Sequence, residues 1–202
     1  FVGPCPETLT TFADKLAAKA EARAAELPVL EGALSASADS VTLAAMVRAL
    51  ALPVALKAVA GGGGRGIRIV TAEDGLEDLI ASALREAESA FGRPELLVER
   101  FLERARHLEV QLLGDGSGRV VHLFDRECSL QRRHQKIIEE APVAGLPEPT
   151  RAAIWAAACR LGERVRLRGL ATVEFLFDGE DFFFLEVNPR LQVEHTVTEA
   201  VT

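Results

Sequence analysis

The stretch of sequence that decides the fold is Glu186-Val-Asn-Pro-Arg-Leu-Gln-Val-Glu194. Polar residues occupy every even position of this stretch, and Val, Pro and Leu occupy the odd positions. Because successive side chains of an extended chain point to opposite faces, the alternation predicts that all five polar groups share one face of a strand. A solvated edge strand would also explain the alternation, but not this particular choice of carboxylate, amide and guanidinium groups.

A second strand with a carboxylate precedes this stretch. Glu174 lies in Ala-Thr-Val-Glu-Phe-Leu-Phe, whose β-branched and aromatic residues predict a strand. The segment Asp178–Asp181 has turn chemistry and predicts a hairpin into the strand that ends at Glu186. Pairing the strands would bring Glu174 close to Glu186, although the sequence does not fix their register. Facing carboxylates repel unless a cation lies between them, and carboxylates with an amide oxygen suit Mg²⁺ or Mn²⁺.

The composition is that of an ordinary globular protein. With 202 residues, 49% hydrophobic and 26% charged, the chain has room for one or two domains. Its net charge of −7 argues against nucleic-acid binding, which needs a broad basic face. No apolar run is long enough to span a bilayer, so we expect no membrane association. The cysteines form no Cys-x-x-Cys pair, which favours a reducing cytoplasm and no structural zinc: Cys5, Cys128 and Cys159.

A glycine-rich hairpin organises the first half of the chain. Lys57 lies inside the apolar strand Val54–Val59, and Gly-Gly-Gly-Gly-Arg-Gly at 61–66 leads into the strand Ile67–Val70. Burying a lysine without an anion is costly, and backbone N–H groups with no side chains in the way suit a polyphosphate. The hairpin therefore predicts phosphate binding, with a mere flexible turn as the alternative. Around it we expect helices at Pro6–Leu27 (apolar face Leu9, Phe12, Leu16 and Ala20), Val41–Leu52 and from a Thr71–Asp74 capping box to Phe91, and a strand at Leu96–Phe101.

The second half predicts a larger antiparallel sheet. Strands are expected at Leu108–Leu113 and Arg119–Phe124, with a helix over Glu148–Arg168 packed on the sheet. Between the strands we expect a loop from Arg126 to Lys136, which holds four cations and a histidine in an acidic protein. Such a run is usually a solvated surface or a docking patch, but beside an acidic metal site it would hold the oxygens of phosphate or carboxylate.

These motifs together resemble the biotin carboxylase component of biotin-dependent carboxylases, which are ATP-grasp enzymes. The matching pieces, in chain order, are Phe-Val-Gly-Pro at the start, Asp14-Lys15, Lys57-Ala58 with the glycine loop, Glu99–Leu102, Arg106–Gln111, Glu127–Lys136 and Glu186–Glu199. Four glycines followed by Arg-Gly are most similar to the pyruvate carboxylase and multidomain acyl-CoA carboxylase branches. The resemblance implies an α+β ATP-grasp fold with a linking helix at 1–28, a small glycine-hairpin lid subdomain at 29–101 and the first part of a larger antiparallel-sheet subdomain at 102–202.

The resemblance implies a nucleotide site shared by the two subdomains. Lys15 and Lys57 would hold the phosphates of ATP, with Gly63 and Gly64 of the lid folded over them. The strand that binds adenine would consist of Glu99, Arg100, Phe101 and Leu102. His107 and His134 would also line the nucleotide site. One or two Mg²⁺ or Mn²⁺ ions that bridge the phosphates would be bound by Glu174, Glu186 and Asn188.

The resemblance also implies a bicarbonate site beside the metal. The groups that hold bicarbonate would be Lys136, Arg190, Gln192 and the backbone of Val193, with Gln131 nearby. Glu194 would be the base that deprotonates bicarbonate, and the neighbouring Arg190 would favour its ionised form.

The implied reaction is the ATP- and bicarbonate-dependent carboxylation of biotin through carboxyphosphate. Family enzymes extend beyond both ends of this span, so we expect the chain to be a piece of a longer, oligomeric protein and to be inactive alone. The only methionine, Met46, is not in a biotin-attachment motif, so biotin would arrive on a carrier in another domain or chain, with a carboxyltransferase domain or subunit. Two alternatives are another ATP-grasp ligase, disfavoured by the loop Gln131–Lys136, and a non-catalytic nucleotide-binding module.

Overall fold

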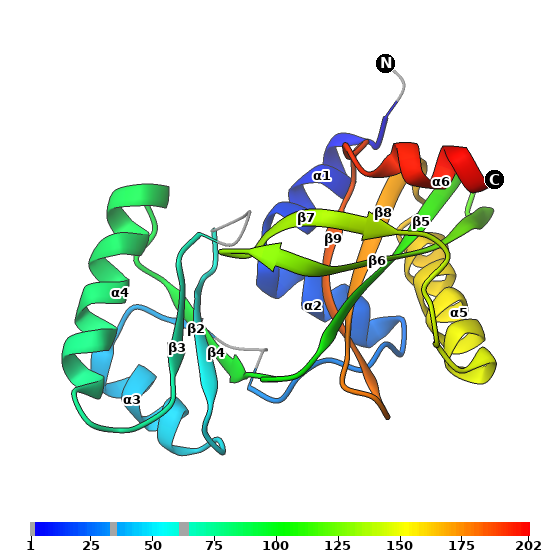
Figure 1. The fold of residues 1–202 in the computed structure, drawn as a ribbon. Helices are drawn as coiled ribbons and strands as arrows, with labels where there is room; N and C mark the ends of the chain where they lie inside the picture. Colours follow the sequence, from blue (N-terminus) through cyan, green and yellow to red (C-terminus); the bar gives the residue numbers. More distant parts are fainter. Residues whose placement is uncertain (1–2, 33–35, 61–64) are drawn as a thin grey trace.

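The computed structural model describes residues 3–32, 36–60 and 65–202, and this part of the chain forms two antiparallel sheets with helices on them (Figure 1). The predicted glycine turn and its Gly63 and Gly64 lie outside the described residues. The smaller sheet has the order β1-β4-β2-β3, with strands Ala36–Ser37, Leu96–Arg100, Val54–Ala58 and Ile67–Val70. The larger sheet has the order β7-β6-β5-β8-β9, with strands Gln135–Glu140, Val120–Arg132, Arg106–Asp115, Arg168–Phe177 and Phe182–Asn188.

Helices α3 (Ser40–Arg48) and α4 (Leu76–Phe91) cover the smaller sheet. Their apolar faces form one core with strands β2 and β4, in which Leu43, Leu56 and Ile80 are fully buried. The predicted capping box at Thr71–Asp74 is wrong. Gly75 precedes α4 in the left-handed conformation with φ 70°, and no side chain caps the helix there. A glycine tolerates that backbone turn, so the chain turns at Gly75 and the helix begins at Leu76.

Helices α1 (Pro6–Ala13), α2 (Lys15–Ala24) and α5 (Glu148–Arg164) pack on the larger sheet. The predicted single helix over Pro6–Leu27 is wrong, because Asp14 is extended and its carboxylate accepts hydrogen bonds from the first backbone N–H groups of α2. The predicted apolar face is also wrong at Leu9 and Ala20, which are exposed, whereas Ala18 and Ala22 are buried. The predicted extension of α5 to Arg168 is wrong as well, since Arg168 begins β8.

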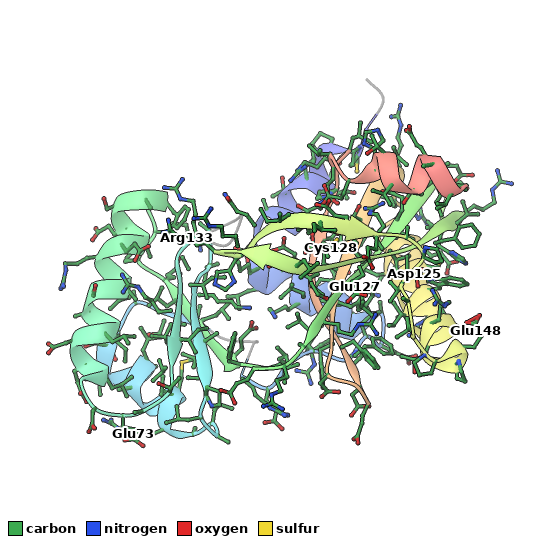
Figure 2. The ribbon with its side chains drawn as sticks, in the orientation of Figure 1. Glu73, Asp125, Glu127, Cys128, Arg133 and Glu148 are labelled. Atoms are coloured by element: carbon green, nitrogen blue, oxygen red, sulfur yellow. The ribbon has the colours of Figure 1, made fainter. Side chains whose placement is uncertain are left out.

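The basic segment Arg126–Lys136 is mostly strand rather than the predicted loop. Strand β6 continues to Arg132, and β7 begins at Gln135. Only Arg133 and His134 form the turn, with φ values of 53° and 63°, as the tightest hairpins require. Figure 2 shows Arg133 at the free end of this hairpin. Within the segment, the buried Arg126 and Cys128 alternate with the half-buried Glu127 and Ser129, as side chains on the two faces of a strand do.

The stretch that opened the sequence argument is a strand for only part of its length. The hairpin at Asp178–Asp181 is confirmed, and the Asp178 carboxylate accepts hydrogen bonds from the N–H groups of Glu180 and Asp181 at 3.0 and 2.8 Å. Strand β9 ends at Asn188, because Pro189 has no N–H to donate to a ladder. The expected single strand to Glu194 is therefore wrong, and Glu194 instead precedes helix α6 (His195–Val201).

Candidate active site

A row of charged side chains crosses the larger sheet on one face. In register, Arg126 of β6 lies opposite Glu109 of β5, Glu109 lies opposite Glu174 of β8, and Glu174 lies opposite Glu186 of β9. The predicted approach of Glu174 and Glu186 is confirmed, because the two residues lie directly opposite each other in the register of β8 and β9. Gln111, Thr172 and Asn188 form the next row on the same face. One face of the sheet thus gathers carboxylates that need cations.

Glu174 is the hub of the row and is 3% exposed. His107 Nε2 lies 2.5 Å from one of its oxygens, and Lys136 Nζ lies 2.8 Å from the other. The Gln131 amide donates to His107 Nδ1 at 2.7 Å, so Nε2 carries the proton that is donated to Glu174. Burial raises the pKa of Glu174, but His107 and Lys136 outweigh burial and lower that pKa below its ordinary value.

Glu186 is in the opposite electrostatic situation. Burial and the neighbouring charge of Glu174 raise the pKa of Glu186, because they disfavour a second negative charge at this point. Lys15 is the largest of the charges that oppose this increase. Burial in turn lowers the pKa of Lys15 to about 8, although Glu186 favours its charged form. The Lys15 ammonium donates to the Ala58 carbonyl at 2.9 Å, which joins helix α2 to the end of strand β2.

The donor set beside these carboxylates fits a divalent cation. Asn188 Nδ2 donates to Glu174 at 2.8 Å and to Glu186 at 3.3 Å, so the amide bridges both carboxylates. Turning the amide over would replace Nδ2 with Oδ1 and create a site with oxygen donors only, which suits Mg²⁺ or Mn²⁺. No group of three or more His, Cys, Asp or Glu side chains in residues 3–32, 36–60 and 65–202 could hold a metal by itself. Phosphate or water oxygens would therefore have to complete the coordination of a cation held by two carboxylates and an amide.

A second cluster, which we call the Lys136 cluster, consists of Lys136, Gln192 and Glu194. The ammonium of Lys136 contacts Glu109 at 2.5 Å, Glu174 at 2.8 Å and Glu194 at 2.9 Å. Burial lowers the pKa of Lys136, but these carboxylates raise it far above its ordinary value, so the side chain stays charged. Gln192 is 7% exposed, donates to Glu174 at 3.5 Å, and has a buried Oε1 without a hydrogen-bond donor. A buried acceptor of this kind fits a ligand that carries an O–H group.

The remaining candidates on this side lie around the rim of the two clusters. Arg190 is exposed and donates to the Leu191 carbonyl at 3.2 Å and to Asn188 Oδ1 at 3.5 Å. The side chain of Val193 is exposed, which leaves its backbone as the group available to a ligand. His134 is exposed at the tip of the β6–β7 hairpin and makes none of the described contacts with the clusters.

Lys57, the candidate lysine of the smaller sheet, forms an ion pair within that sheet. Lys57 of β2 forms an ion pair with Glu99 of β4, whose other oxygen accepts from Lys19 of α2 at 2.7 Å. Glu99 is fully buried and thus holds two cations, one from its own sheet and one from a helix on the other sheet. Strand β4 ends at the exposed Arg100, and the chain leaves the sheet through the half-buried Phe101 and Leu102.

Sequence reasoning missed Lys19, Glu109 and Arg126. The signal for Glu109 was present, since His107, Glu109 and Gln111 alternate with the buried Leu108, Val110 and Leu112. Lys19 gave no comparable signal, because a lysine in an amphipathic helix is usually exposed.

Comparison with solved structures defines the class of protein. The chain matches the crystal structure of the biotin carboxylase–β-γ-ATP complex from Campylobacter jejuni with a TM-score of 0.96 and 43% identity, over 100% of this chain and 46% of that chain. It matches the biotin carboxylase domain of a Hydrogenobacter thermophilus 2-oxoglutarate carboxylase, in complex with MgADP, ADP and bicarbonate, with a TM-score of 0.94, 37% identity and coverage of 100% and 45%. The fold is therefore the α+β ATP-grasp fold of biotin carboxylases, as predicted.

Sequence comparison assigns the family. Residues 14–202 match the model of the carbamoyl-phosphate synthase L chain ATP-binding domain, and the chain belongs to this family. It is 46% identical to pyruvate carboxylase from Staphylococcus aureus and 44% identical to biotin carboxylase from Pseudomonas aeruginosa, in each case over its whole length. The chain spans 18% of the first relative and 45% of the second. The resemblance drawn from the motifs is thus confirmed. Within the described residues, no helix is sufficiently long and apolar to cross a membrane.

Proposed function

We propose that this chain forms the ATP- and bicarbonate-binding part of an enzyme that carboxylates biotin. The observation that carries the proposal is the junction at Lys136, which joins Glu174 of the carboxylate row to Glu194 beside the buried acceptor of Gln192. Two ligands that must react with each other, a nucleotide–metal complex and a small oxyanion, would thereby meet at adjoining clusters. The solved relative that holds MgADP together with bicarbonate supports this assignment.

Lys15 and Lys57 would hold the phosphates of ATP. Lys15 suits this role because burial disfavours its positive charge, and a phosphate oxygen would favour the charged form. Lys57 would have to exchange Glu99 for the phosphate, and Lys19 would then remain on the buried carboxylate. Gly63 and Gly64 would cover the phosphates, and the segment Glu99–Leu102 with His107 and His134 would line the nucleotide site.

Glu174, Glu186 and Asn188 would bind Mg²⁺ or Mn²⁺. A bound cation would neutralise charge on the phosphates and offset the repulsion between the two glutamates. The negative charge of Glu174 helps to raise the pKa of Glu186, which is the effect expected of this repulsion. The pair therefore fits a site in which both glutamates are fully ionised when a cation is bound.

The Lys136 cluster, together with Arg190, Gln131 and the backbone of Val193, would hold bicarbonate. Glu194 would accept the bicarbonate proton. Burial raises its pKa, but the hydrogen bond from Lys136 and the nearby positive charges lower it overall, so the group is ionised and can act as a base near neutral pH. An oxygen of the deprotonated substrate would then attack the γ-phosphorus of ATP as the bond to ADP breaks.

The product of that step is carboxyphosphate. It would decompose to CO₂ and phosphate, the released phosphate would take the proton of the ureido nitrogen of biotin, and that nitrogen would bond to the CO₂ carbon. We propose that biotin arrives on a carrier in another domain or chain, that a carboxyltransferase uses carboxybiotin, and that the working protein is a longer cytoplasmic oligomer. Within it, residues 29–101 would act as the lid subdomain and 102–202 as part of the larger subdomain, joined through 1–28.

The experiment that tests this function is ADP release by the full-length protein with Mg-ATP and free biotin, with and without bicarbonate. We expect turnover that depends on added bicarbonate. ATP turnover indifferent to bicarbonate would instead support another ATP-grasp ligase. A folded protein that binds nucleotide without turnover would be a binding module.

A further inference from the structure

Arg126 belongs to the basic segment of the sequence, yet it has no part in the proposed substrate contacts. Its side chain is 0% exposed, although a guanidinium cannot lose its charge inside a protein. A fully buried cation is tolerated only when several acceptors surround it, so the identity of those acceptors shows what the side chain holds.

The partners of Arg126 come from three separate elements. Its Nε donates to Glu109 at 2.5 Å, and its Nη1 donates to Gln111 at 3.0 Å, both on β5. The same Nη1 donates to Thr198 Oγ1 of helix α6 at 2.7 Å, and Nη2 donates to Thr172 of β8 at 3.4 Å. Arg126 therefore ties the sheet directly to helix α6.

Both Glu109 and helix α6, which Arg126 contacts, are also connected to the Lys136 cluster. Glu109 uses one oxygen for Arg126 and the other for Lys136, at 2.5 Å. Helix α6 begins immediately after Glu194, so the position of the helix fixes where the carboxylate of Glu194 meets Lys136. A single buried guanidinium thus controls the partner of Lys136 on one side and the backbone that carries Glu194 on the other.

We propose that Arg126 is a positioning residue, which holds Glu109 and helix α6 so that Lys136 and Glu194 meet at the bicarbonate-binding cluster. Without Arg126, Glu109 would be a buried carboxylate with Lys136 as its remaining cation, and it would draw Lys136 away from Glu194 and Glu174. Helix α6 would also lose its side-chain bond to the sheet. The kinetic part of this inference rests on the proposed function, whereas the part that concerns helix α6 does not.

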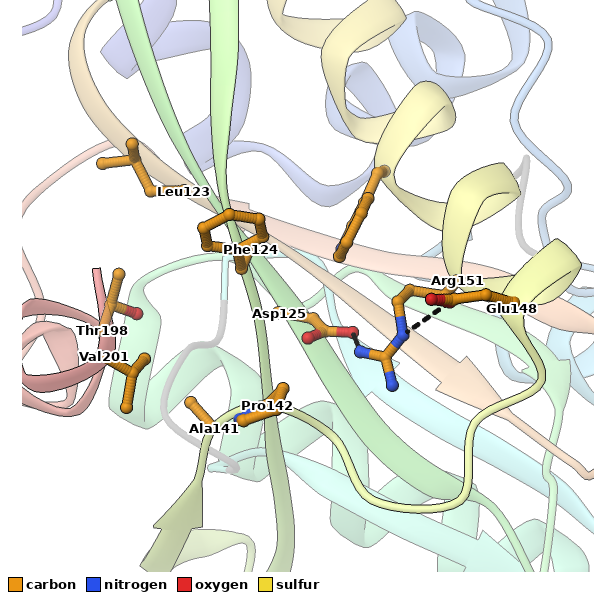
Figure 3. Close-up of a pocket in the computed structure, with 10 residues that line it drawn as sticks. Leu123, Phe124, Asp125, Ala141, Pro142, Glu148, Arg151, Thr198 and Val201 are labelled. Atoms are coloured by element: carbon orange, nitrogen blue, oxygen red, sulfur yellow. Dashed lines mark hydrogen bonds and ion pairs between the residues drawn. The ribbon is translucent and has the colours of Figure 1, made fainter.

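The opposite face of β6 provides a matched control. Asp125 points away from Arg126, because neighbouring strand residues face opposite sides, and it forms a buried ion pair with Arg151 of α5 (Figure 3). Arg151 also bonds the Val143 carbonyl at 2.7 Å and contacts Glu148, beside a cavity of about 390 Å³ lined by Phe124 and Trp155. Replacing Arg151 removes a buried arginine from the same part of the sheet without touching Lys136 or Glu194.

The test compares Arg126→Met, Arg126→Lys, Thr198→Val and Arg151→Met in the full-length protein. For Arg126→Met we expect the KM for bicarbonate to rise about tenfold or more, with a much smaller change in the KM for ATP, because the displaced Lys136 would lose its charge-assisted contact with bicarbonate. Arg126→Lys should recover part of the loss, since it restores a cation beside Glu109. Thr198→Val, which keeps every charge, should raise the KM for bicarbonate by a few-fold. Arg151→Met should lower the melting temperature and leave both KM values unchanged.

Amide hydrogen exchange over residues 195–201 tests the structural part independently. We expect exchange to be about tenfold faster in Arg126→Met and Thr198→Val, and unchanged in Arg151→Met. The proposal would be overturned if Arg126→Met raised the KM for both substrates equally, or if Arg126→Met behaved like Arg151→Met. If Arg126→Met does not fold, unaltered exchange in Thr198→Val would overturn it. Wild-type turnover that ignores bicarbonate would overturn the proposed function instead, and the exchange rates would still decide whether Arg126 holds helix α6.

Discussion

Lys136 on the larger sheet and Lys57 on the smaller sheet both pair with buried carboxylates, but those carboxylates differ in kind. The partners of Lys136 include Glu174 and Glu194, which are themselves candidate site residues. The partner of Lys57 is Glu99, which lies inside the smaller sheet and also holds Lys19. The larger sheet therefore presents an assembled cluster, whereas Lys57 can reach a phosphate only by exchanging partners. We infer that the cluster proposed to bind bicarbonate is preorganised and that the lysine proposed to bind phosphate rearranges on binding.

The largest effect should come from the carboxylate pair of the larger sheet. In the proposed enzyme, Glu186→Gln keeps the shape of the side chain but removes one charge from the cation site. We expect bicarbonate-dependent ADP release to fall about 1,000-fold or more, because a metal contributes several kcal/mol to transition-state stabilisation. Glu180→Gln, at the exposed turn of the same hairpin, is the control and should retain full activity. Normal turnover in Glu186→Gln would mean that the carboxylate row is structural.

The next largest effect should come from replacing Lys57, which is proposed to leave Glu99 and bind phosphate. For Lys57→Met we expect the KM for ATP to rise about 10- to 100-fold, since a charge-assisted bond to phosphate is lost, while the KM for bicarbonate changes little. Steady-state kinetics with each substrate varied in turn would measure both constants. A larger change in the KM for bicarbonate than in the KM for ATP would contradict the proposal that the smaller sheet binds phosphate and the larger sheet binds bicarbonate.

Lys15 should give nucleotide binding a characteristic dependence on pH. The pKa of about 8 means that the lysine is charged below pH 7, where affinity should not vary through this group. Above pH 8 the protein must take up a proton to bind phosphate, so affinity should fall by up to about tenfold per pH unit until the pKa of the bound state is reached. Titration with a fluorescent ATP analogue from pH 6.5 to 9.5 would measure this. Lys15→Arg remains charged and should give a flat profile over that range, whereas the same slope in that variant would assign the titration to another group.

The smallest effect should come from Lys19. Lys19→Met leaves Lys57 as the remaining cation on the buried Glu99, so Lys57 should leave Glu99 less readily. We expect the KM for ATP to rise by a few-fold, roughly 1 kcal/mol of lost binding, with Lys19→Arg close to the wild type. If Lys19→Met left the KM for ATP unchanged while the protein stayed folded, Lys57 would not depend on a shared carboxylate.

The features that sequence reasoning found are those in which local pattern and tertiary structure agree. The alternation around Glu174 and Glu186, with the turn between them, predicted a hairpin that the structure contains in register. The helix break at Asp14 was missed because helical spacing continues through it, and only the hydrogen bonds of its carboxylate reveal a cap. The pairing of Lys136 with Glu194 could not be predicted from spacing, since it depends on where helix α6 is packed rather than on either local pattern.

The turn at Asp178–Asp181 also determines how this region tolerates changes in length. Because side chains alternate with a period of two, inserting or deleting one residue in the turn would shift β9 by one position against β8. Glu186 would then face the apolar core, and its place beside Glu174 would be taken by one of its neighbours, Leu185 or Val187, according to the direction of the shift. Substitutions at the exposed Glu180 should be accepted freely, whereas a change of one residue in turn length would exchange the two faces of the strand. For insertion of tags or fluorescent reporters, this short hairpin is therefore a poor site despite its exposure.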